Sequence, residues 1–399
     1  FINSMKQVAS RLKSLPNVIG FETLNEPGSG YIGARTLDGP LVFMRKGKTP
    51  TSLEGMLLAA GYSQQVGVYK NGRKKEEVKL NQAGVSLWKD GYEPIWKKNK
   101  VWTDKDSNPK GLDVNHFCIV DGKRVNFNKD YYKPFLEKYI AGIRSVMPDS
   151  IIFIQSAITK SKPPKFKKDE IKNLAHTPHV YDAKTLKRGE FYPHVPQESD
   201  DILIQRFASK LAQIPKKTDM PTLIGEFGLR FDLNNGRAYK NGDFSAHVRA
   251  LNCYYKAIEE NLLSCAIWNY TADNTNKHGD QWNGEDFSIF SYDQQKNYDN
   301  LNSGGRGLKG FIRPYPHKIA GKPVSMNFNL EQRIFKFEFK NNPQIKAPTE
   351  FFIPRYQYPK GYNVSLSAGD YEINYDQQQL RIKDCSVNDV VTLKVTPKD

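Results

Sequence analysis

The sequence predicts an α/β part built from parallel strands and helices, followed by an antiparallel all-β part. In residues 1–30 and about 131–312, short β-branched runs alternate with longer stretches of helical period. Strands that are joined by helices pair in parallel. From about residue 318 to the end, apolar residues instead stand at every second position, which is typical of half-buried antiparallel strands. The fold class is therefore α/β, with a β-rich C-terminal part.

Five strands and four helices are expected in the α/β part. The strands cover residues 18–24, 150–154, 176–181, 222–227 and 264–269. The helices cover residues 1–15, 131–145, 202–214 and 247–261. A row of five parallel strands fits the later part of a (β/α) barrel, but a doubly wound sheet produces the same coarse pattern. Periodicity does not choose between the two.

Residues 31–130 interrupt this alternation. They are rich in glycine, proline, lysine and aromatic residues and show no sustained period, so we expect a loop-rich interlude. Structureless connections of this length are uncommon and are usually functional. One element is predicted at the end of the interlude, a hairpin in which residues 117–120 and 124–127 flank the turn dipeptide Asp121-Gly122.

Strict alternation of apolar and charged residues over 333–340 marks the clearest strand of the C-terminal part. Further strands are expected at 371–375, 379–382 and 390–395. Strands of this kind, separated by turn residues, predict a small antiparallel β-sandwich that packs on the first part. A role of this sandwich in binding carbohydrate or a membrane is left open.

Composition and charge exclude several classes of function. No apolar run in the 399 residues approaches the ~18 residues that a membrane-spanning helix needs. The formal net charge of +16 raises the question of a nucleic-acid partner. The local lysine runs, 70–75 and 160–168, lie in no helix-turn-helix, RNP-like or zinc-finger context, so no nucleic acid is expected. Weak attraction to an acidic surface or to anionic lipid stays open.

The four cysteines are far apart and form no CxxC motif, so neither a disulfide scaffold nor a metal site is expected. A Cys253–Cys265 bridge is conceivable, but both lie in apolar stretches where cysteine is usually a small buried hydrophobe. The low cysteine count favours an intracellular compartment, cytoplasm or vacuole, over secretion. Phe1 opens inside a helical pattern, so we expect the sequence to be truncated at its N-terminus, with any targeting segment out of view.

Two glutamates stand at the ends of predicted strands, Glu26 after residues 18–24 and Glu226 in 222–227. In a (β/α) barrel, residues at these positions point into the mouth of the active site. A single such carboxylate would be read as structural, but a pair fits glycoside hydrolysis, which needs one acid and one nucleophile or base. Asn25 adds an amide beside Glu26 that suits a sugar 2-hydroxyl.

An ordered set of motifs gives this pair a family. It consists of Asn25-Glu26-Pro27, His179-Val180-Tyr181, Trp268, the polar stretch 271–286 and Arg313-Pro314-Tyr315-Pro316. The set resembles the clan-A retaining glycosidases and, within them, glycoside hydrolase family 5. It is similar in particular to the fungal endoglycoceramidase-related branch, whose members hydrolyse steryl β-glucosides or glucosylceramide. The resemblance covers nearly the whole chain.

The resemblance implies a (β/α)8 TIM barrel followed by the β-sandwich. Residues 1–312 would form the C-terminal part of the barrel, with about strands 4 to 8 present and a long insertion at about 31–130. Residues 318–399 would form the β-sandwich domain. The family's first three strands, which carry further residues of the glucose pocket, have no counterpart here. The chain is therefore expected to be a fragment or a remnant of the barrel.

The resemblance also implies roles for single residues. Glu26 would be the general acid/base, and Glu226 the nucleophile that forms a covalent glucosyl-enzyme, with the two carboxyl groups roughly 5 Å apart. Tyr181 would hydrogen-bond Glu226, His179 would orient a carboxylate or the sugar, and Trp268 would form the floor under the glucose ring. For these last three, an ordinary structural role stays open. No cofactor is implied.

The expected substrate is a glucoside with an apolar aglycone, a sterol or ceramide, and peripheral membrane contact is left open. Trp282, Asn283 and Glu285 would form a lid or wall over a single glucose. Apolar residues of the interlude would line the aglycone site, unless they form a minor core of the insertion. These residues are Tyr31, Phe43, Met44, Met56, Leu57, Leu58, Tyr62, Trp88, Trp96 and Trp102. Two alternatives are an endo-acting endoglycoceramidase and a non-catalytic glycolipid-binding remnant.

Overall fold

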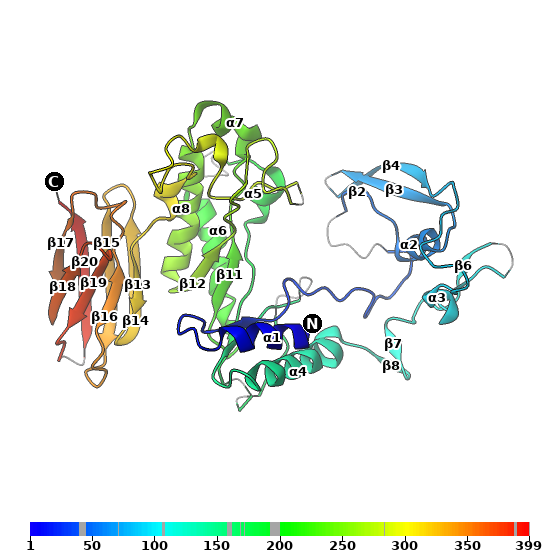
Figure 1. Cartoon of the computed structure of the whole chain (residues 1–399), viewed down its shortest axis with the longest axis horizontal. Helices are drawn as coiled ribbons and strands as arrows, with labels where there is room; N and C mark the ends of the chain where they lie inside the picture. The colour runs from blue at the N-terminus through cyan, green and yellow to red at the C-terminus, as the bar shows by residue number, and fades with distance from the viewer. Residues whose placement is uncertain are drawn as a thin grey trace. The chain divides into compact units, whose positions relative to one another are not determined.

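The structure, a computed structural model, divides the chain into two compact units, Phe1–Asn173 and Leu174–Asp399 (Figure 1). It describes residues 1–39, 45–70, 72–105, 108–157, 162–167, 169–170, 172–191, 200–282, 284–386 and 389–398. Phe43, Met44 and Asn283, which the sequence analysis singled out, lie outside these ranges, as do parts of the two lysine runs. The boundary expected between barrel and sandwich, at 312–318, stays a prediction.

The first unit contains two of the expected parallel strands. β1 (Gly20–Glu22) pairs with β9 (Ile151–Ile154), and Phe21 stands opposite Ile152. Helix α1 (Ile2–Leu12) packs against α4 (Lys133–Arg144), which continues from the π-helical turn η1 (Phe127–Tyr132). These elements confirm the expected helix–strand alternation at both ends of the unit.

Between these ends, residues 31–130 are more ordered than the sequence predicts. β2 (Gly47–Lys48), β3 (Gln64–Lys70) and β4 (Arg73–Leu80) form an antiparallel sheet, and α2 (Ser52–Ala59) begins with a capping box from Thr51 and Glu54. The short elements that follow are α3 (Ile95–Lys98), β5 (Trp102–Thr103), β6 (Lys110–Gly111), β7 (Ile119–Val120) and β8 (Lys123–Arg124).

The sequence analysis therefore missed most of the ordered elements within this loop-rich interlude, whereas the hairpin is confirmed. β7 and β8 pair around Asp121 and Gly122, both of which have positive φ, as the dipeptide predicts. β4 was missed because it is exposed along most of its length and shows no apolar alternation. Pairing with β3, and not hydrophobic period, defines it.

The insertion also has a core of its own. Met56, Leu57 and Trp102 are buried together with Leu37 and Val101. The side chains packed around this core include Tyr31, Tyr62 and Trp96. For the buried three, the reading as an aglycone wall is corrected: they are packed against one another and leave no apolar surface for a ligand.

The second unit carries three further parallel segments. β10 (Leu174–His176) runs beside β11 (Leu223–Phe227), with parallel bridges from His176 to Thr222 and from His179 to Glu226. β11 pairs in turn with β12 (Ser264–Ile267). The strand expected at 176–181 thus begins two residues earlier, and its regular part ends before Pro178, which lacks the N–H that a ladder needs.

Helices cover this sheet and close its core (Figure 1). α6 (Asp200–Ala212) and α8 (Ser245–Glu260) contribute Phe207 and Tyr254, which pack with Ile224 and Phe227 of β11. The remaining helices of the described residues are α5 (Ala183–Arg188), η3 (Pro215–Lys217), α7 (Leu233–Asn241), η4 (Tyr292–Gln294) and α9 (Leu308–Phe311). This core packs against β11 and so fixes the strand end that carries Glu226.

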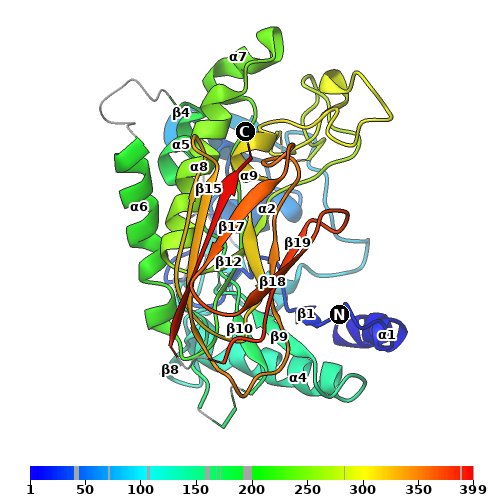
Figure 2. The same cartoon turned by 90° about the vertical axis from the view of Figure 1, so that its left-hand side faces the viewer.

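Two four-stranded antiparallel sheets follow (Figure 2). One has the order β13 (Tyr315–Lys318), β16 (Thr349–Phe352), β19 (Gln379–Lys383), β18 (Asp370–Asn374). The other has the order β14 (Gly321–Asn329), β15 (Ile334–Asn341), β20 (Val390–Pro397), β17 (Tyr362–Leu366). Phe335, Phe337 and Phe339 of β15 share one core with Phe351 and Leu380 of the facing sheet. This is the antiparallel sandwich that the alternation predicts.

All four cysteines are free thiols, including Cys253 and Cys265. Burial raises the pKa of both of these thiols to about 12, which makes them unreactive. Among the described residues, no helix combines the length and the apolar character needed to cross a membrane.

His247 is buried in α8, near the side chains of Arg306 and Asp286. Its ring stacks on Phe231 at 5.2 Å, and its Nε2 lies 3.1 Å from the Phe231 carbonyl, which makes Nε2 the donor. Among the described residues its Nδ1 has no hydrogen-bond partner. Burial, helped by the nearby charge of Arg306, lowers the pKa of His247 from 6.5 to about 4. The ring is therefore neutral at pH 7.

We expect this histidine to make the fold acid-sensitive. In the unfolded chain it binds a proton near pH 6.5, whereas in the folded chain it does so near pH 4. Its contribution to stability is therefore complete above about pH 6.5 and is lost as the pH falls to about 4, by an amount on the order of 3 kcal/mol. Urea unfolding of the parent and of His247→Gln at pH 7 and pH 4.5 measures it. An equal acid loss in both proteins would contradict the assignment.

Candidate active site

Glu226 is the centre of the site in the second unit. It is the penultimate residue of β11, and its side chain is 17% exposed. The Tyr181 hydroxyl donates a hydrogen bond of 2.7 Å to its Oε1, and His179 Nδ1 lies 3.3 Å from the same oxygen. His179 is held beside Glu226 by the parallel bridge between them, so the backbone pairing sets this geometry. The expected hydrogen bond between Tyr181 and Glu226 is present.

The chain that leaves β12 passes directly over the end of β11. The Trp268 N–H donates to the Phe227 carbonyl at 2.7 Å, and the peptide between Trp268 and Asn269 is cis. A Cβ at Gly228 would lie 2.3 Å from the Trp268 carbonyl oxygen, so only glycine allows this approach. The hydrogen bond to Phe227 and the close approach to Gly228 hold the half-buried Trp268 beside the end of β11, next to Glu226. Its role as a sugar platform stays a prediction.

Phe287 completes the packing around the tyrosine. Its ring meets that of Tyr181 edge to face, with centroids 5.9 Å apart. The Phe287 N–H donates to Asp280 at 2.8 Å, which anchors the ring from the following loop. Tyr181 is therefore held by a neighbour that the sequence analysis did not select.

The loop after β12, residues 271–286, is held by buried polar groups. Asn274 donates to Asp280 at 2.8 Å and to Asp286 at 2.9 Å. Arg306, which is fully buried, donates to both oxygens of Asp286 at 3.0 and 2.5 Å. Buried charges of this kind are tolerated only when they are paired and hydrogen-bonded. Much of the loop's polarity thus serves its own structure.

Two of the residues expected to act as a lid lie at this loop. Trp282 is 65% exposed, and Glu285 is half-buried. The sequence analysis expects both side chains to face the ligand. That role stays a prediction.

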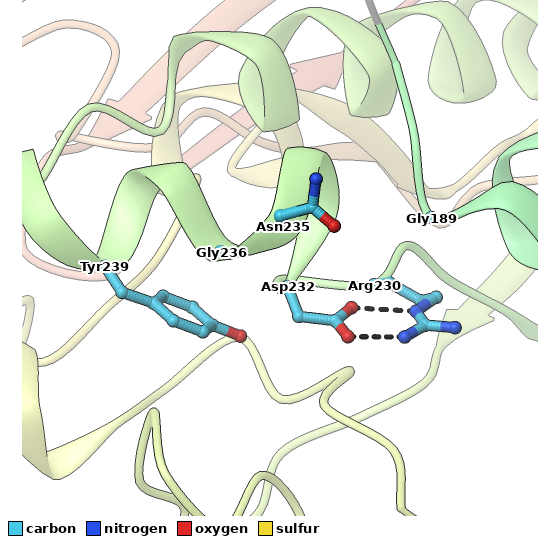
Figure 3. A pocket seen from close by; sticks show the side chains of 6 residues that line it. All are labelled: Gly189, Arg230, Asp232, Asn235, Gly236 and Tyr239. Atoms are coloured by element: carbon cyan, nitrogen blue, oxygen red, sulfur yellow. Dashed lines mark hydrogen bonds and ion pairs between the residues drawn. The ribbon is translucent and has the colours of Figure 1, made fainter.

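Behind the loop lies a polar pocket of about 270 Å³ (Figure 3). Arg230 and Asp232 lie side by side in its lining and form a two-point ion pair, and the Tyr239 hydroxyl bonds Asp286. The Asp232 charge and its hydrogen bonds raise the pKa of Arg230 above its ordinary value. Because these groups are engaged with protein partners, we interpret the pocket as part of the frame that supports the loop.

Glu26 occupies a comparable position in the first unit. It follows β1 by four residues, has a positive φ of 43°, and is half-buried, whereas Asn25 is exposed. Its N–H donates to Oε1 of Gln155 at 2.7 Å. Gln155 is 2% exposed and directly follows β9, the strand beside β1. The two strand ends are therefore tied together at the candidate acid/base.

Tyr132 supports the same strand ends. Its hydroxyl donates to the Gln155 carbonyl at 3.1 Å and lies 3.4 Å from the Thr23 hydroxyl. Burial raises the pKa of Tyr132 to about 12, so it stays a neutral donor. Gln155, Tyr132 and Phe287 are the residues that sequence reasoning missed. Gln155 was detectable, because it is a polar residue at the end of the apolar run 151–154, as Glu226 is at the end of its own.

The fold and the site define a class: an α/β protein whose candidate acidic residues stand where parallel strands end. Two family models match the chain. The model described as "Cellulase (glycosyl hydrolase family 5)" matches residues 97–274, and the model described as "Glycoside hydrolase family 5 C-terminal domain" matches residues 313–395. The chain belongs to glycoside hydrolase family 5. Its first part has the TIM-barrel fold of that family and is followed by the antiparallel sheets. The number of barrel strands stays a prediction.

Individual relatives are fungal. The chain is 30% identical to a glucosylceramidase of Rhizopus delemar, over 95% of this chain and 63% of the relative. It is 25% identical to an ergosteryl-beta-glucosidase of Saccharomyces cerevisiae, over 94% and 63%. The crystal structure of Cryptococcus neoformans sterylglucosidase 1 superposes with a TM-score of 0.85 at 25% identity, over 100% of this chain and 66% of that one. The chain thus spans about three fifths of the length of these curated relatives, and the expected family and branch are confirmed.

Proposed function

We propose that the chain belongs to a retaining β-glucosidase that hydrolyses lipid-linked glucosides through Glu226 and Glu26. The observation that carries the proposal is the contact of Tyr181 and His179 with Oε1 of Glu226. Two contacts to one oxygen fix the orientation of the carboxylate, and a nucleophile must be aimed at the carbon that it attacks. Since both contacts hold Oε1, we assign the attack to Oε2.

The reaction follows as two displacements. Oε2 of Glu226 bonds to the anomeric carbon while the bond between that carbon and the aglycone oxygen breaks. The aglycone oxygen keeps the electron pair of the broken bond and receives a proton from Glu26. Glu26, now a carboxylate, then removes a proton from water. The water oxygen bonds to the anomeric carbon and Glu226 departs, so the configuration is retained. This requires the two carboxyl groups to lie roughly 5 Å apart.

The proposed substrate is a monoglucoside of a sterol or of ceramide. The names of the relatives, glucosylceramidase and ergosteryl-beta-glucosidase, support this class of substrate. Exposed Trp282 and half-buried Glu285 support a wall that closes over one glucose. Such substrates lie in lipid, so peripheral membrane contact is part of the proposal.

Comparison of three substrates tests the proposed function: a steryl glucoside, glucosylceramide and a ganglioside. We expect release of glucose from one or both monoglucosides, with the ganglioside a poor substrate. Release of an intact oligosaccharide from the ganglioside would support the endo-acting alternative instead. Binding of the monoglucosides without turnover would support the non-catalytic remnant. The assay is run on the chain and on the longer protein that contains it, if there is one.

Gln155 offers a separate test of the role of Glu26. Gln155→Leu removes the acceptor of the Glu26 N–H and leaves a buried donor unpaired, which costs about 1–3 kcal/mol. We expect kcat/KM for an alkyl or steryl glucoside to fall about ten-fold or more, and that for a dinitrophenyl glucoside to change little, because dinitrophenolate departs without a proton. Tyr139→Phe, which removes a hydrogen bond of 2.8 Å to the Glu22 carbonyl of β1 and does not touch Glu26, serves as the control. Equal losses on both substrates would show that Gln155 does not act through the acid.

A further inference from the structure

Four large apolar side chains stand exposed in one stretch of the insertion, residues 81–100. Val85 is 61% exposed, Leu87 81%, Tyr92 72% and Ile95 46%. Leaving side chains of this size in water is costly, so their concentration in one short segment indicates an interaction site. This stretch, the 81–100 segment, lies between β4 and β5 and includes α3.

The backbone of the 81–100 segment is fixed in this outward arrangement. The Asn81 side chain donates to the carbonyls of Leu58 and Val85 and accepts from the Val85 N–H at 2.9 Å. The Leu87 N–H donates to the Ala59 carbonyl at 2.9 Å, which ties the segment to the end of α2. The core of the insertion is already filled by other residues. Val85 and Leu87 therefore cannot turn inward without breaking these bonds.

The charge of the 81–100 segment indicates which kind of partner it binds. The 81–100 segment contains four lysines and two acidic residues. Lys97 is paired with Asp104 at 2.8 Å, whereas Lys89, Lys98 and Lys100 are exposed in the same segment as the apolar side chains. A second copy of the chain would bring these like charges together. Nucleic acid would leave the aliphatic side chains without a partner. An anionic bilayer accommodates both the lysines and the apolar side chains, since its interface accepts apolar and tyrosine side chains while its headgroups attract lysine.

We propose that the 81–100 segment docks on the surface of an anionic lipid bilayer. Val85, Leu87, Tyr92 and Ile95 enter the boundary between headgroups and acyl chains, and the lysines lie among the headgroups. The proposal rests on the proposed function in one respect: a glucosidase of lipid-linked glucosides meets its substrate at that surface. The docking itself needs no catalysis.

Vesicle sedimentation of the full chain tests this surface. The vesicles are phosphatidylcholine alone or phosphatidylcholine with about one third phosphatidylserine. The variant is Leu87→Ser with Tyr92→Ser. The matched control is Leu301→Ser with Tyr298→Ser, which makes the same changes at two other exposed residues, 102% and 80% exposed. We expect binding to the anionic vesicles to weaken about ten-fold or more in the variant and to be unchanged in the control. Exchanging Lys89, Lys98 and Lys100 for glutamine should have a similar effect and reduce the salt dependence.

Three outcomes would overturn the proposal: unchanged binding in the variant, equal binding to neutral and anionic vesicles, or a dimer that the variant converts to a monomer. Circular dichroism of the variants verifies that they fold. Turnover of a soluble dinitrophenyl glucoside separates this proposal from the proposed function. If the variant loses vesicle binding but keeps turnover of the soluble glucoside, the 81–100 segment is assigned as the docking surface. If vesicles bind but no glucoside is turned over, the proposed function fails and the docking stands.

Discussion

If Glu226 is the nucleophile that we propose, we expect its replacement with glutamine to lower β-glucoside turnover by about 10⁴-fold, equal to about 5 kcal/mol of transition-state stabilisation. The amide keeps an oxygen that accepts the Tyr181 hydrogen bond, so the local structure is retained. It cannot form the covalent glucosyl-enzyme, so the effect falls on the chemical step. The measurement is kcat and kcat/KM on an activated glucoside, with circular dichroism to verify folding.

Two further variants make this result specific. Tyr181→Phe removes one hydrogen bond to a charged group, about 1.5–3 kcal/mol, so turnover falls by about 10- to 100-fold and not by 10⁴. Glu226→Ala opens space beside the anomeric carbon, where added azide attacks directly and gives the product of inverted configuration. A Glu226→Gln protein that keeps a tenth of the parent activity would exclude Glu226 as the nucleophile.

Replacing Arg313 with methionine destabilises the fold by about 3–5 kcal/mol, because it leaves the carboxylate of Glu259 buried and unpaired. Arg313 Nε donates to Glu259 at 2.6 Å, and the two side chains are 3% and 4% exposed. The second oxygen of Glu259 accepts the N–H of Phe328 in β14 at 3.1 Å. The pair thus joins α8 to the sandwich within the second unit. Urea unfolding measures the loss.

Arg249→Met is the matched control. Arg249 pairs with Asp200 at 2.7 Å, but these side chains are 43% and 32% exposed, so we expect a loss below about 1 kcal/mol. Combining Arg313→Met with Glu259→Gln should recover part of the stability, since the amide is neutral and still accepts from Phe328. If Arg313→Met costs no more than Arg249→Met, the buried pair does not hold these elements together.

The parts of the fold that the sequence predicts best are those where hydrophobic period and burial coincide. β9 and β11 are short apolar runs buried inside the units, and β15 alternates strictly because one of its faces is buried. β4 has neither feature, since most of its side chains are exposed and its partner strand defines it. Patterns that depend on burial cannot reveal a strand that is stabilised mainly by its backbone pairing.

The candidate site also contains residues that the sequence predicts and residues that it does not. Glu26 and Glu226 were selected because a carboxylate at a strand end is chemically costly, and Tyr181 because a motif places it near them. Gln155 obeys the same strand-end rule but is neutral, so it drew no attention. The buried network of the 271–286 loop was out of reach, because a polar residue that is buried and paired, such as Asn274, reads in sequence like one that faces solvent.

The covalent intermediate gives the most direct test of the central claim, that Glu226 is the nucleophile of a retaining β-glucosidase. Incubation with an activated 2-deoxy-2-fluoroglucoside slows hydrolysis of the glycosyl-enzyme, so the intermediate accumulates, and peptide mass spectrometry then locates the attached sugar. We predict one fluoroglucosyl group per chain, on the peptide that contains Leu223–Phe227, and its absence in Glu226→Gln. Attachment at another carboxylate, or turnover of the parent β-glucoside with release of α-glucose and no labelled peptide, would contradict the account.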